Sequence, residues 1–124
     1  MSEPRRIASG SPYEGRIGFS RAIAIDDRVV VSGTAPVWPD GSCDPDAYTQ
    51  ARRCFEIIEQ ALTEAGSSLA GVVRTRMFLV DADAVGRAHG EVFGEVRPAA
   101  TMVVVKALLD PRWKVEIEAE AIVP

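Results

Sequence analysis

The sequence has few of the residues that mark a secreted, membrane-bound or metal-binding protein. Its 124 residues include only two cysteines and one histidine. Small secreted folds use larger cysteine frameworks, so we expect Cys43 and Cys54 to be free thiols in a reducing compartment. A membrane-spanning helix needs about 18–20 consecutive apolar residues, and the apolar runs here are far shorter. The segment after Met1 also lacks a signal-like apolar stretch, so we expect a cytoplasmic protein with no membrane partner.

The scarcity of histidine also limits the chemistry available. His89 has Glu91 and Glu95 nearby, but a protein metal site needs three or four converging ligands. We interpret His89 as an incidental residue on the polar face of a helix, and we expect no metal site. Ser32 has no plausible His-Asp pair, which argues against a catalytic triad. The sequence contains no glycine-rich phosphate-binding loop.

The charge and composition point to an ordinary globular chain. The formal net charge is −4, and the arginines are spread along the sequence rather than clustered. Phosphate binding needs Lys and Arg concentrated on one surface, so we expect no nucleic-acid partner. Apolar residues make up 47% of the chain and charged residues 26%, which is close to globular usage. A chain of this length suits one core, and we expect residues 1–124 to form a single domain.

A β-hairpin is the first element that the patterns predict. A weak extended stretch surrounds Ile7, and residues 20–26 then alternate between two faces. The pair Asp26-Asp27 interrupts that alternation before the β-branched run at residues 28–33. Two such segments separated by a short polar break are typical of two strands joined by a tight turn.

A long helix is predicted to follow the hairpin. Residues 34–44 form a loop rich in proline and glycine. Asp44 followed by Pro45 predicts a helix N-cap with proline at the first helical position. Apolar residues then recur at helical spacing as far as Ala65, and Gly66 is the expected C-terminal stop.

The second half of the chain predicts three strands and one more helix. Alternation predicts a strand at residues 72–80, and either Asp81 or Asp83 caps a second amphipathic helix. Further strands are expected at residues 101–105 and 114–123. The order β-β-β-α-β-α-β-β predicts an α+β fold, in which two helices pack on one face of one mixed sheet.

The face of the sheet away from the helices carries an unusual set of charges. In the last strand, Glu116, Glu118 and Glu120 alternate with apolar residues. Arg74 and Arg76 occupy the corresponding face of the strand at residues 72–80. Opposite charges on neighbouring strands can pair at roughly 0.2–1 kcal/mol each. Two interpretations remain open: a solvated sheet face, or an oligomer interface with a site.

Several segments, in order and at compatible spacing, resemble the Rid/YjgF (reactive-intermediate deaminase) family. The first resembles the family's opening motif G-P-Y-S-Q-A, and the second resembles V-S-G-Q-x-P. The others resemble A-A-G…D-V-V-K, P-A-R-S/T-x-V-x-V and the closing V-E-I-E-A. Taken in the order of these five motifs, the resembling segments are residues 18–22, 31–36, 65–75, 97–105 and 114–119.

The resemblance implies a trimer similar to that of chorismate mutase, with three sheets enclosing a central barrel and three clefts between subunits. Active members of the family hydrolyse reactive enamines and imines, such as 2-aminoacrylate and 2-iminopropanoate, to a 2-keto acid and ammonia. They use neither a metal nor an organic cofactor. The expected partners are therefore two further copies of this chain and a small-molecule ligand.

Three positions of the resembling motifs depart from the active pattern. The family arginine that clamps the substrate carboxylate matches Ala100, so the planar, bidentate guanidinium contact is lost. The opening tyrosine matches Phe19, and a cysteine often found after the arginine matches Met102. These changes predict that 2-aminoacrylate and 2-iminopropanoate are poor substrates.

The remaining site residues are assigned from the same resemblance. Glu116 is the residue expected to position the attacking water, as a carboxylate general base. The expected ligand-binding residues are Phe19, Ser32, Gly33, Arg76, Ala100, Thr101 and Met102.

Two arginines remain candidates to replace the missing clamp. Arg76 either reaches the cleft or forms an ion pair with Glu116 or Glu118, and Arg97 either reaches the cleft or is a solvated helix-end charge. Two functions stay open on this basis. One is a divergent, cofactor-free hydrolase of a small imine, enamine or carbonyl compound. The other is a non-catalytic trimeric module whose clefts serve as a small-ligand-binding or regulatory site.

Overall fold

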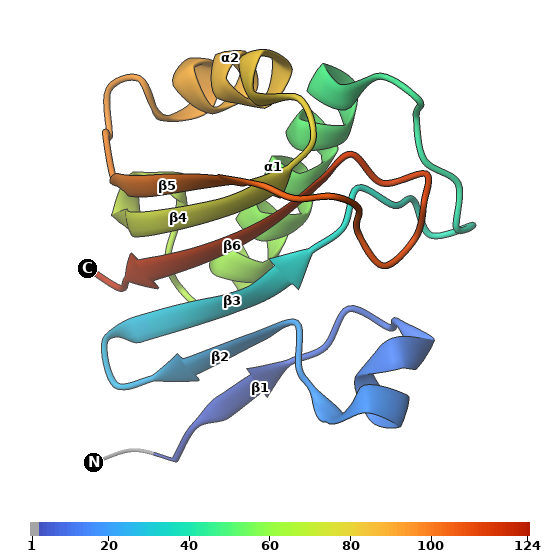
Figure 1. Ribbon diagram of the computed structural model, residues 1–124. Helices are drawn as coiled ribbons and strands as arrows, with labels where there is room; N and C mark the ends of the chain where they lie inside the picture. The colour runs from blue at the N-terminus through green and yellow to red at the C-terminus, as the bar shows by residue number, and fades with distance from the viewer. Residues whose placement is uncertain (1–2) are drawn as a thin grey trace.

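The computed structural model describes residues 3–124, which form one six-stranded sheet in the order β1-β2-β3-β6-β4-β5 (Figure 1). Neighbouring strands are antiparallel except β4 and β5, which run parallel. The strands are β1 (Arg5–Ile7), β2 (Ala22–Ile25), β3 (Arg28–Thr34), β4 (Val72–Leu79), β5 (Ala99–Val104) and β6 (Val115–Ile122).

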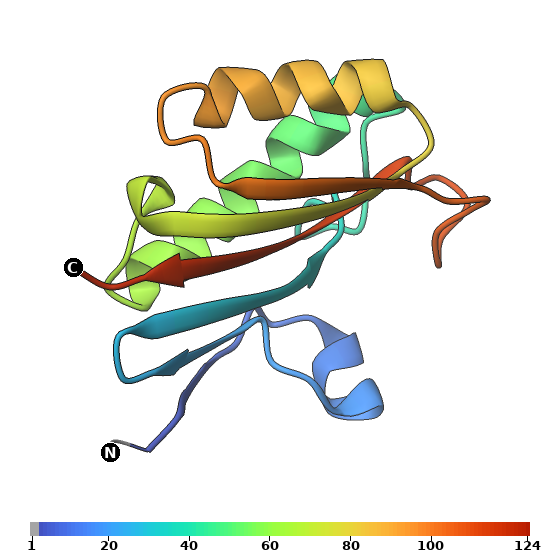
Figure 2. The same cartoon turned by 60° about the vertical axis from the view of Figure 1, so that its left-hand side comes forward.

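Two α-helices cover one face of this sheet within the described residues: α1 (Ala47–Glu64) and α2 (Ala82–Phe93). Figure 2 shows both helices on the same side, with the other face left open. The predicted α+β class, with a mixed sheet and two helices on one face, is confirmed. In the part of the chain that the structure describes, no helix is long and apolar enough to span a membrane.

The core forms where the alternating strands meet the apolar stripes of the helices. In β6 the residues with odd numbers are buried and the glutamates between them are only partly exposed. Ile117 of β6 and Ile58 of α1 are among the largest fully buried side chains. Full burial of a side chain of this size contributes about 1.5–3 kcal/mol. The predicted partition of the strand faces is therefore confirmed.

The start of α1 differs from the predicted one. Asp46, rather than Asp44, is the N-cap, and its carboxylate accepts hydrogen bonds from the backbone N–H of Thr49 at 2.9 Å and from its hydroxyl at 2.7 Å. Asp44 instead accepts a hydrogen bond from the backbone N–H of Asp46 at 2.9 Å. Asp44 and Pro45 therefore shape the turn before the helix.

Strand β5 is one of the two edge strands of the sheet, opposite β1, and begins at Ala99, two residues earlier than predicted. It pairs only with β4, and all six of its residues are exposed. Helix α2 supplies the crossover that two parallel neighbouring strands require. This edge strand is central to the candidate site because it carries three of the predicted ligand-binding residues.

A short helical segment that the patterns did not predict precedes β2. Residues Glu14–Gly18 form one π-helical turn, and Gly18 ends it at φ +92°, a left-handed conformation that suits glycine. The N–H of Phe19 donates a hydrogen bond to the carbonyl of Glu14 at 2.9 Å. This turn brings the chain back to the sheet at Arg21, directly before β2.

Candidate functional site between sheet and edge strand

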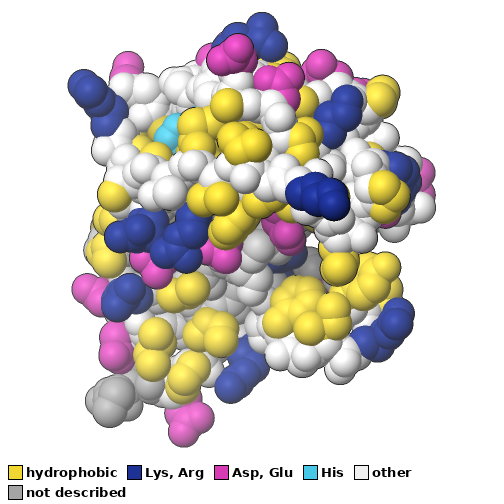
Figure 3. All heavy atoms as spheres, viewed as in Figure 1, with side chains coloured by type: hydrophobic (Ala, Val, Ile, Leu, Met, Phe, Trp, Pro, Cys, Tyr) yellow, Lys and Arg dark blue, Asp and Glu magenta, His cyan; other side chains and the backbone are white. Residues whose placement is uncertain are grey.

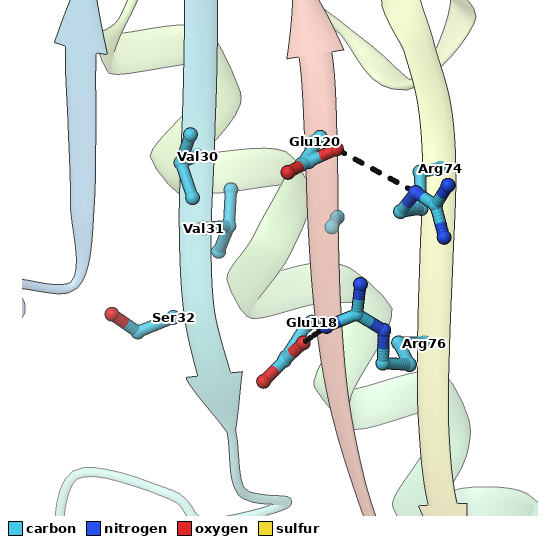
Figure 4. A pocket seen from close by; sticks show the side chains of 8 residues that line it. Val30, Val31, Ser32, Arg74, Arg76, Glu118 and Glu120 are labelled. Carbon is cyan, nitrogen blue, oxygen red and sulfur yellow. Dashed lines mark hydrogen bonds and ion pairs between the residues drawn. The ribbon is translucent and has the colours of Figure 1, made fainter. Parts of the chain in front are cut away.

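The open face of the sheet carries ion pairs rather than isolated charges. Arg76 Nη1 lies 3.0 Å from Glu118 Oε1, and Arg74 Nε lies 3.7 Å from Glu120 Oε2 (Figure 4). Arg28 approaches the other oxygen of Glu120 at 4.0 Å. In Figure 3 basic and acidic side chains stand side by side over the central strands. The ion-pair interpretation of Arg76, with Glu118 as its partner, is thus confirmed.

These pairs line a shallow groove that crosses three strands. Figure 4 shows Arg74 and Arg76 projecting from β4 towards the glutamates of β6. Ser32 projects from β3, on the opposite side of β6 from the arginines. The groove is lined by Val30, Val31, Ser32, Arg74, Arg76, Glu118, Ala119 and Glu120. Because the arginines are already paired, they leave the groove with little free positive charge.

Glu116 lies beyond the end of this groove, at an irregularity between β3 and β6. The register of the two strands shifts between Val31 and Thr34, so Ser32 and Gly33 bulge out of the regular ladder. A Cβ atom on Gly33 would stand 3.0 Å from Glu116 Oε2. Glycine at this position therefore leaves room for the carboxylate.

The surroundings of Glu116 favour its protonated form. Burial raises the pKa of its carboxyl group, and the charge of Glu118 raises it further, while the charge of Arg21 opposes both effects. A carboxylate with a raised pKa is a better proton acceptor near neutral pH. Glu116 is therefore suited to the role of general base that was predicted for it.

Arg21 is the site residue that the sequence patterns did not single out. Its side chain is only 8% exposed, and Nη2 donates a hydrogen bond to the carbonyl of Gly33. Its Nε is buried and has no hydrogen-bond partner. One signal was present in the sequence, because the resembling family motif has glutamine where this chain has Arg21.

The hydroxyl and thiol groups around the bulge have structural partners. Ser32 Oγ donates to the carbonyl of Ser20 at 2.6 Å, and Thr34 Oγ1 donates to the carbonyl of Ser32 at 2.9 Å. Cys54 Sγ donates to the carbonyl of Thr34 at 3.2 Å. Burial raises the pKa of the Cys54 thiol strongly, so it stays protonated and is a poor nucleophile.

The β5 residues of the predicted site lie apart from Glu116 within one chain. Ala100 pairs with Thr75 and Met102 pairs with Met77, both of which face the helices. Thr101 is paired with Arg76 and so shares the open face with it. Strand β4 separates β5 from β6. One chain therefore does not gather all of the predicted pocket residues at one point.

The prediction that His89 lies on the polar face of its helix was wrong. Its ring is half-buried between Phe55 and Phe93, with centroid distances of 5.9 and 4.8 Å. Its Nε2 lies 2.8 Å from Thr75 Oγ1, and burial lowers the pKa of the imidazole. His89 thus packs under β4, against Thr75 and two phenylalanine rings. Among residues 3–124, no three His, Cys, Asp or Glu side chains are grouped as metal ligands would be.

Two other predicted residues lie near elements that border the site. Phe19 is half-buried at the end of the π-helical turn, two residues before Arg21. Arg97 is exposed beyond α2, where its N–H donates to the carbonyl of Phe93 at 2.8 Å and its φ is +54°. Arg97 therefore lies at a helix end, as its alternative interpretation expected.

The fold and the charged open face define an α+β protein with a candidate site at the Gly33 bulge. The sequence model of the family described as Endoribonuclease L-PSP matches residues 12–123, and this chain belongs to that family. The predicted membership of the Rid/YjgF family is confirmed by relatives and solved structures that carry the RutC and YjgF names.

Two relatives and one crystal structure show the range of similarity. An uncharacterized protein of Streptomyces coelicolor is 45% identical, over 94% of this chain and 90% of its own length. A protein named 3-aminoacrylate deaminase RutC, from Acinetobacter baylyi, is 36% identical over 81% of this chain and 82% of its own. Rv2704 of Mycobacterium tuberculosis, a YjgF/YER057c/UK114 family member, superposes with a TM-score of 0.88 at 41% identity, covering 98% and 100% of the two chains.

Proposed function

We propose that three copies of this chain form a trimer whose clefts hydrolyse a small imine, enamine or related carbonyl compound without a cofactor. The main support for this proposal is the position of Glu116 beside the Gly33 bulge, where burial raises the pKa of its carboxyl group. Each cleft would combine this bulge with the β5 edge of a neighbouring copy. That arrangement brings Ala100, Thr101 and Met102 to a carboxylate that they do not meet within one chain.

The exposed edge strand supports such an assembly. Met102, Val103 and Val104 of β5 are all substantially exposed apolar residues. An unpaired edge strand with apolar side chains is a site for association with another chain. Within this proposal the 124 residues act as one domain, and the free thiols of Cys43 and Cys54 are consistent with a reducing cytoplasm.

The proposed chemistry needs one water molecule and one proton acceptor. Glu116 takes a proton from water as the oxygen attacks the imine carbon, which gives a tetrahedral carbinolamine. Glu116 passes that proton to the imine nitrogen, then accepts the proton of the new hydroxyl group and transfers it to the nitrogen as the C–N bond breaks and the C=O bond forms. The products are the carbonyl compound and ammonia, so the imine and the water are fully accounted for. Phe19 would supply an apolar wall to the cleft.

The identity of residue 100 limits the substrate. Without an arginine at Ala100, a 2-imino acid loses its bidentate carboxylate contact at the β5 edge. We therefore expect 2-iminopropanoate to be turned over poorly. The relative named 3-aminoacrylate deaminase makes 3-aminoacrylate a second compound to test, because its enamine carbon lies one bond further from the carboxylate.

The test is ammonia release from a panel of 2-iminopropanoate, 3-aminoacrylate and neutral imines. We expect turnover of at least one compound, with a loss of about 100-fold or more in kcat for Glu116→Gln. Glu59→Gln, on the exposed face of α1, removes the same charge far from the bulge and should keep full activity. Turnover of 2-iminopropanoate that depends on Glu116 but not on Arg76 would contradict the expected substrate preference.

A non-catalytic trimeric module with a small-ligand-binding or regulatory site is the second candidate. The replacements at Phe19, Ala100 and Met102 favour it, because each removes a polar group of the active family pattern. Ala100→Arg discriminates between the two candidates. If this variant gains 2-iminopropanoate deaminase activity, the remaining catalytic groups are intact. If no compound in the panel is turned over by either form, the binding function is supported.

A further inference from the structure

Arg21 is a buried cation that holds the backbone of the Gly33 bulge. Only 8% of the residue is exposed, and Nη2 donates a hydrogen bond to the carbonyl of Gly33. The carbonyl of Arg21 accepts a hydrogen bond from the N–H of Ser32 at 3.0 Å. The residue directly before β2 therefore contacts two successive residues of the bulge, once through its backbone and once through its side chain.

The guanidinium of Arg21 is covered by protein rather than open to the groove. Its Nε is buried, and Arg21 is not one of the residues that line the groove over β3, β6 and β4. Arg74 and Arg76, by contrast, project into the groove and are paired with glutamates there (Figure 4). Arg21 therefore acts on the site through the protein groups that it touches or faces, and not by contact with a ligand.

Gly33 adjoins both this cation and the proposed general base. Its carbonyl accepts the hydrogen bond from Arg21, and a Cβ on Gly33 would stand 3.0 Å from Glu116 Oε2 and 3.2 Å from Cδ. Among residues 3–124, Arg21 and Glu116 form no ion pair. Their opposite charges thus act on one another across one glycine, and burial limits the screening of that attraction by solvent and salt.

A second carboxylate, that of Glu14, also faces Arg21. It accepts hydrogen bonds from the backbone N–H and the hydroxyl of Ser9. Although burial acts in the opposite direction, these hydrogen bonds lower the pKa of Glu14. Because the pKa of Glu116 is raised instead, the two carboxylates titrate in different pH ranges and their effects on Arg21 can be told apart.

The groups around Glu116 act on its charge in opposite directions. Burial, the largest effect, raises the pKa of its carboxyl group, the charge of Arg21 lowers it, and the charge of Glu118 raises it again. Cys54 faces it from α1, but burial raises the pKa of this thiol so strongly that it stays neutral. The β4 residue paired with Glu116 is Phe78, which has no charge. Among the described groups, Arg21 is therefore the one that favours the charged carboxylate.

That balance matters for a general base. A base must be charged to accept a proton, yet basic enough to take it from water. Burial alone drives Glu116 towards the protonated form, which accepts no proton. The resembling family motif has an uncharged glutamine where this chain has Arg21. A cation beside the base is therefore a feature of this chain rather than of the motif.

We propose that Arg21 is a positioning residue of this site, which fixes the Gly33 bulge and keeps Glu116 charged near neutral pH without touching the ligand. This inference rests on the proposed function, in which Glu116 is the proton acceptor. Lysine at residue 21 would keep the charge but lose the planar fork of donors, whereas glutamine would lose the charge. The two roles of Arg21 can therefore be separated by substitution.

The experiment measures the ionisation of Glu116 directly, on the purified protein without a ligand. Glutamate and arginine side chains are labelled with ¹³C, and their NMR signals are followed as the pH changes. Glu116→Gln identifies the Glu116 Cδ signal by its loss. Arg21→Gln and Arg21→Lys are compared with wild type. Arg28→Gln, at the start of β3, is the matched control because it removes the same charge from an exposed position.

We expect Arg21→Gln to bind the Glu116 proton about threefold or more tightly than wild type does, so the midpoint of the Glu116 titration moves to higher pH. Arg21→Lys should stay closer to wild type than Arg21→Gln does, and Arg28→Gln should match wild type. In the wild-type protein the Arg21 Cζ signal should shift together with the Glu116 signal, and Glu116→Gln should abolish that shift. This comparison decides the matter even if neither Arg21 variant folds.

Three results would overturn the inference: equal Glu116 midpoints in Arg21→Gln and Arg28→Gln, equal changes in Arg21→Gln and Arg21→Lys, or a wild-type Arg21 signal that ignores the ionisation of Glu116. The proposed function fails separately. If Arg21 tunes Glu116 but no compound of the panel is hydrolysed in a Glu116-dependent way, the tuning stands and the hydrolase is wrong. If hydrolysis depends on Glu116 while its midpoint is insensitive to Arg21→Gln, the hydrolase stands and Arg21 is only structural.

Discussion

At the scale of single residues, the candidate site depends on what surrounds Gly33. Arg21 binds its carbonyl, Glu116 packs against its Cα, and Ser32 precedes it in the same bulge. The resemblance to a known family predicted Ser32, Gly33 and Glu116 as site residues, and their roles remain predictions. Arg21 was missed because a charged residue beside a strand is usually exposed, and its burial depends on contacts with distant segments.

Glu116 makes the stability of the protein depend on pH. Burial raises its pKa above the usual value of 4.5, so the folded state holds the proton more tightly than the unfolded chain does. The stability from this proton is fully present below about pH 4.5 and is lost as pH rises through the folded pKa. Glu116→Gln removes this loss, and we expect the variant to be more stable than wild type at pH 7 but not at pH 4.

Urea denaturation at both pH values, at one fixed protein concentration, checks this expectation. Glu59→Gln is the control, because it removes the same charge from an exposed position on α1, far from the bulge. A Glu116→Gln variant that is less stable than wild type at pH 7 would show that the ionised carboxylate is well compensated, contrary to its described surroundings.

At the scale of secondary-structure elements, the sequence patterns predicted both α-helices and all six strands to within a few residues. They missed the π-helical turn at residues 14–18 and the short 3-10 helix Leu69–Gly71. Periodicities of 2 and 3.6 are local, so a short window of residues carries them. The start of α1 was predicted at Asp44 because aspartate followed by proline is a common helix-start signal. Asp46 is also an aspartate, and aspartate is favoured as an N-cap whether or not proline follows. Only the fold shows which carboxylate reaches a helical N–H.

The capping role of Asp46 gives a direct prediction. Asp46→Ala should lower the free energy of unfolding by about 1 kcal/mol, because the N–H of Thr49 loses its acceptor. Asp46→Asn should cost far less, since asparagine caps helices about as well as aspartate does. Chemical denaturation measures both changes. Equal losses for the alanine and asparagine variants would mean that the charge, rather than the cap, is what stabilises α1.

At the scale of the whole molecule, the open sheet face and the β5 edge lead to the proposed trimer. Light scattering should give three times the 13.4 kDa mass of one chain. Val103→Asp places a charge on β5 where it shares the open face with Phe78 and Arg76, and we expect it to yield monomers. Gln60→Glu adds the same charge on the helix side and should leave the assembly unchanged.

A monomer in the wild-type protein would contradict the proposed clefts, because Glu116 and Ala100 would then never face one another. A trimer that survives Val103→Asp would instead place the subunit contact elsewhere on the molecule. Neither result bears on the Gly33 bulge itself, where Arg21, Glu116 and Ser32 meet within one chain.

By itself the sequence determined the two α-helices, the six strands and the buried and charged sides of the long strands, and its resemblance to a family showed that Ala100 replaces an arginine. These features follow from local spacing and from the identity of single residues. Only the tertiary structure decided that β6 lies between β3 and β4, that the register slips at Gly33, and that Arg21 is buried beside Glu116. Those features depend on which distant strands pair and in what register, and no local pattern encodes that choice.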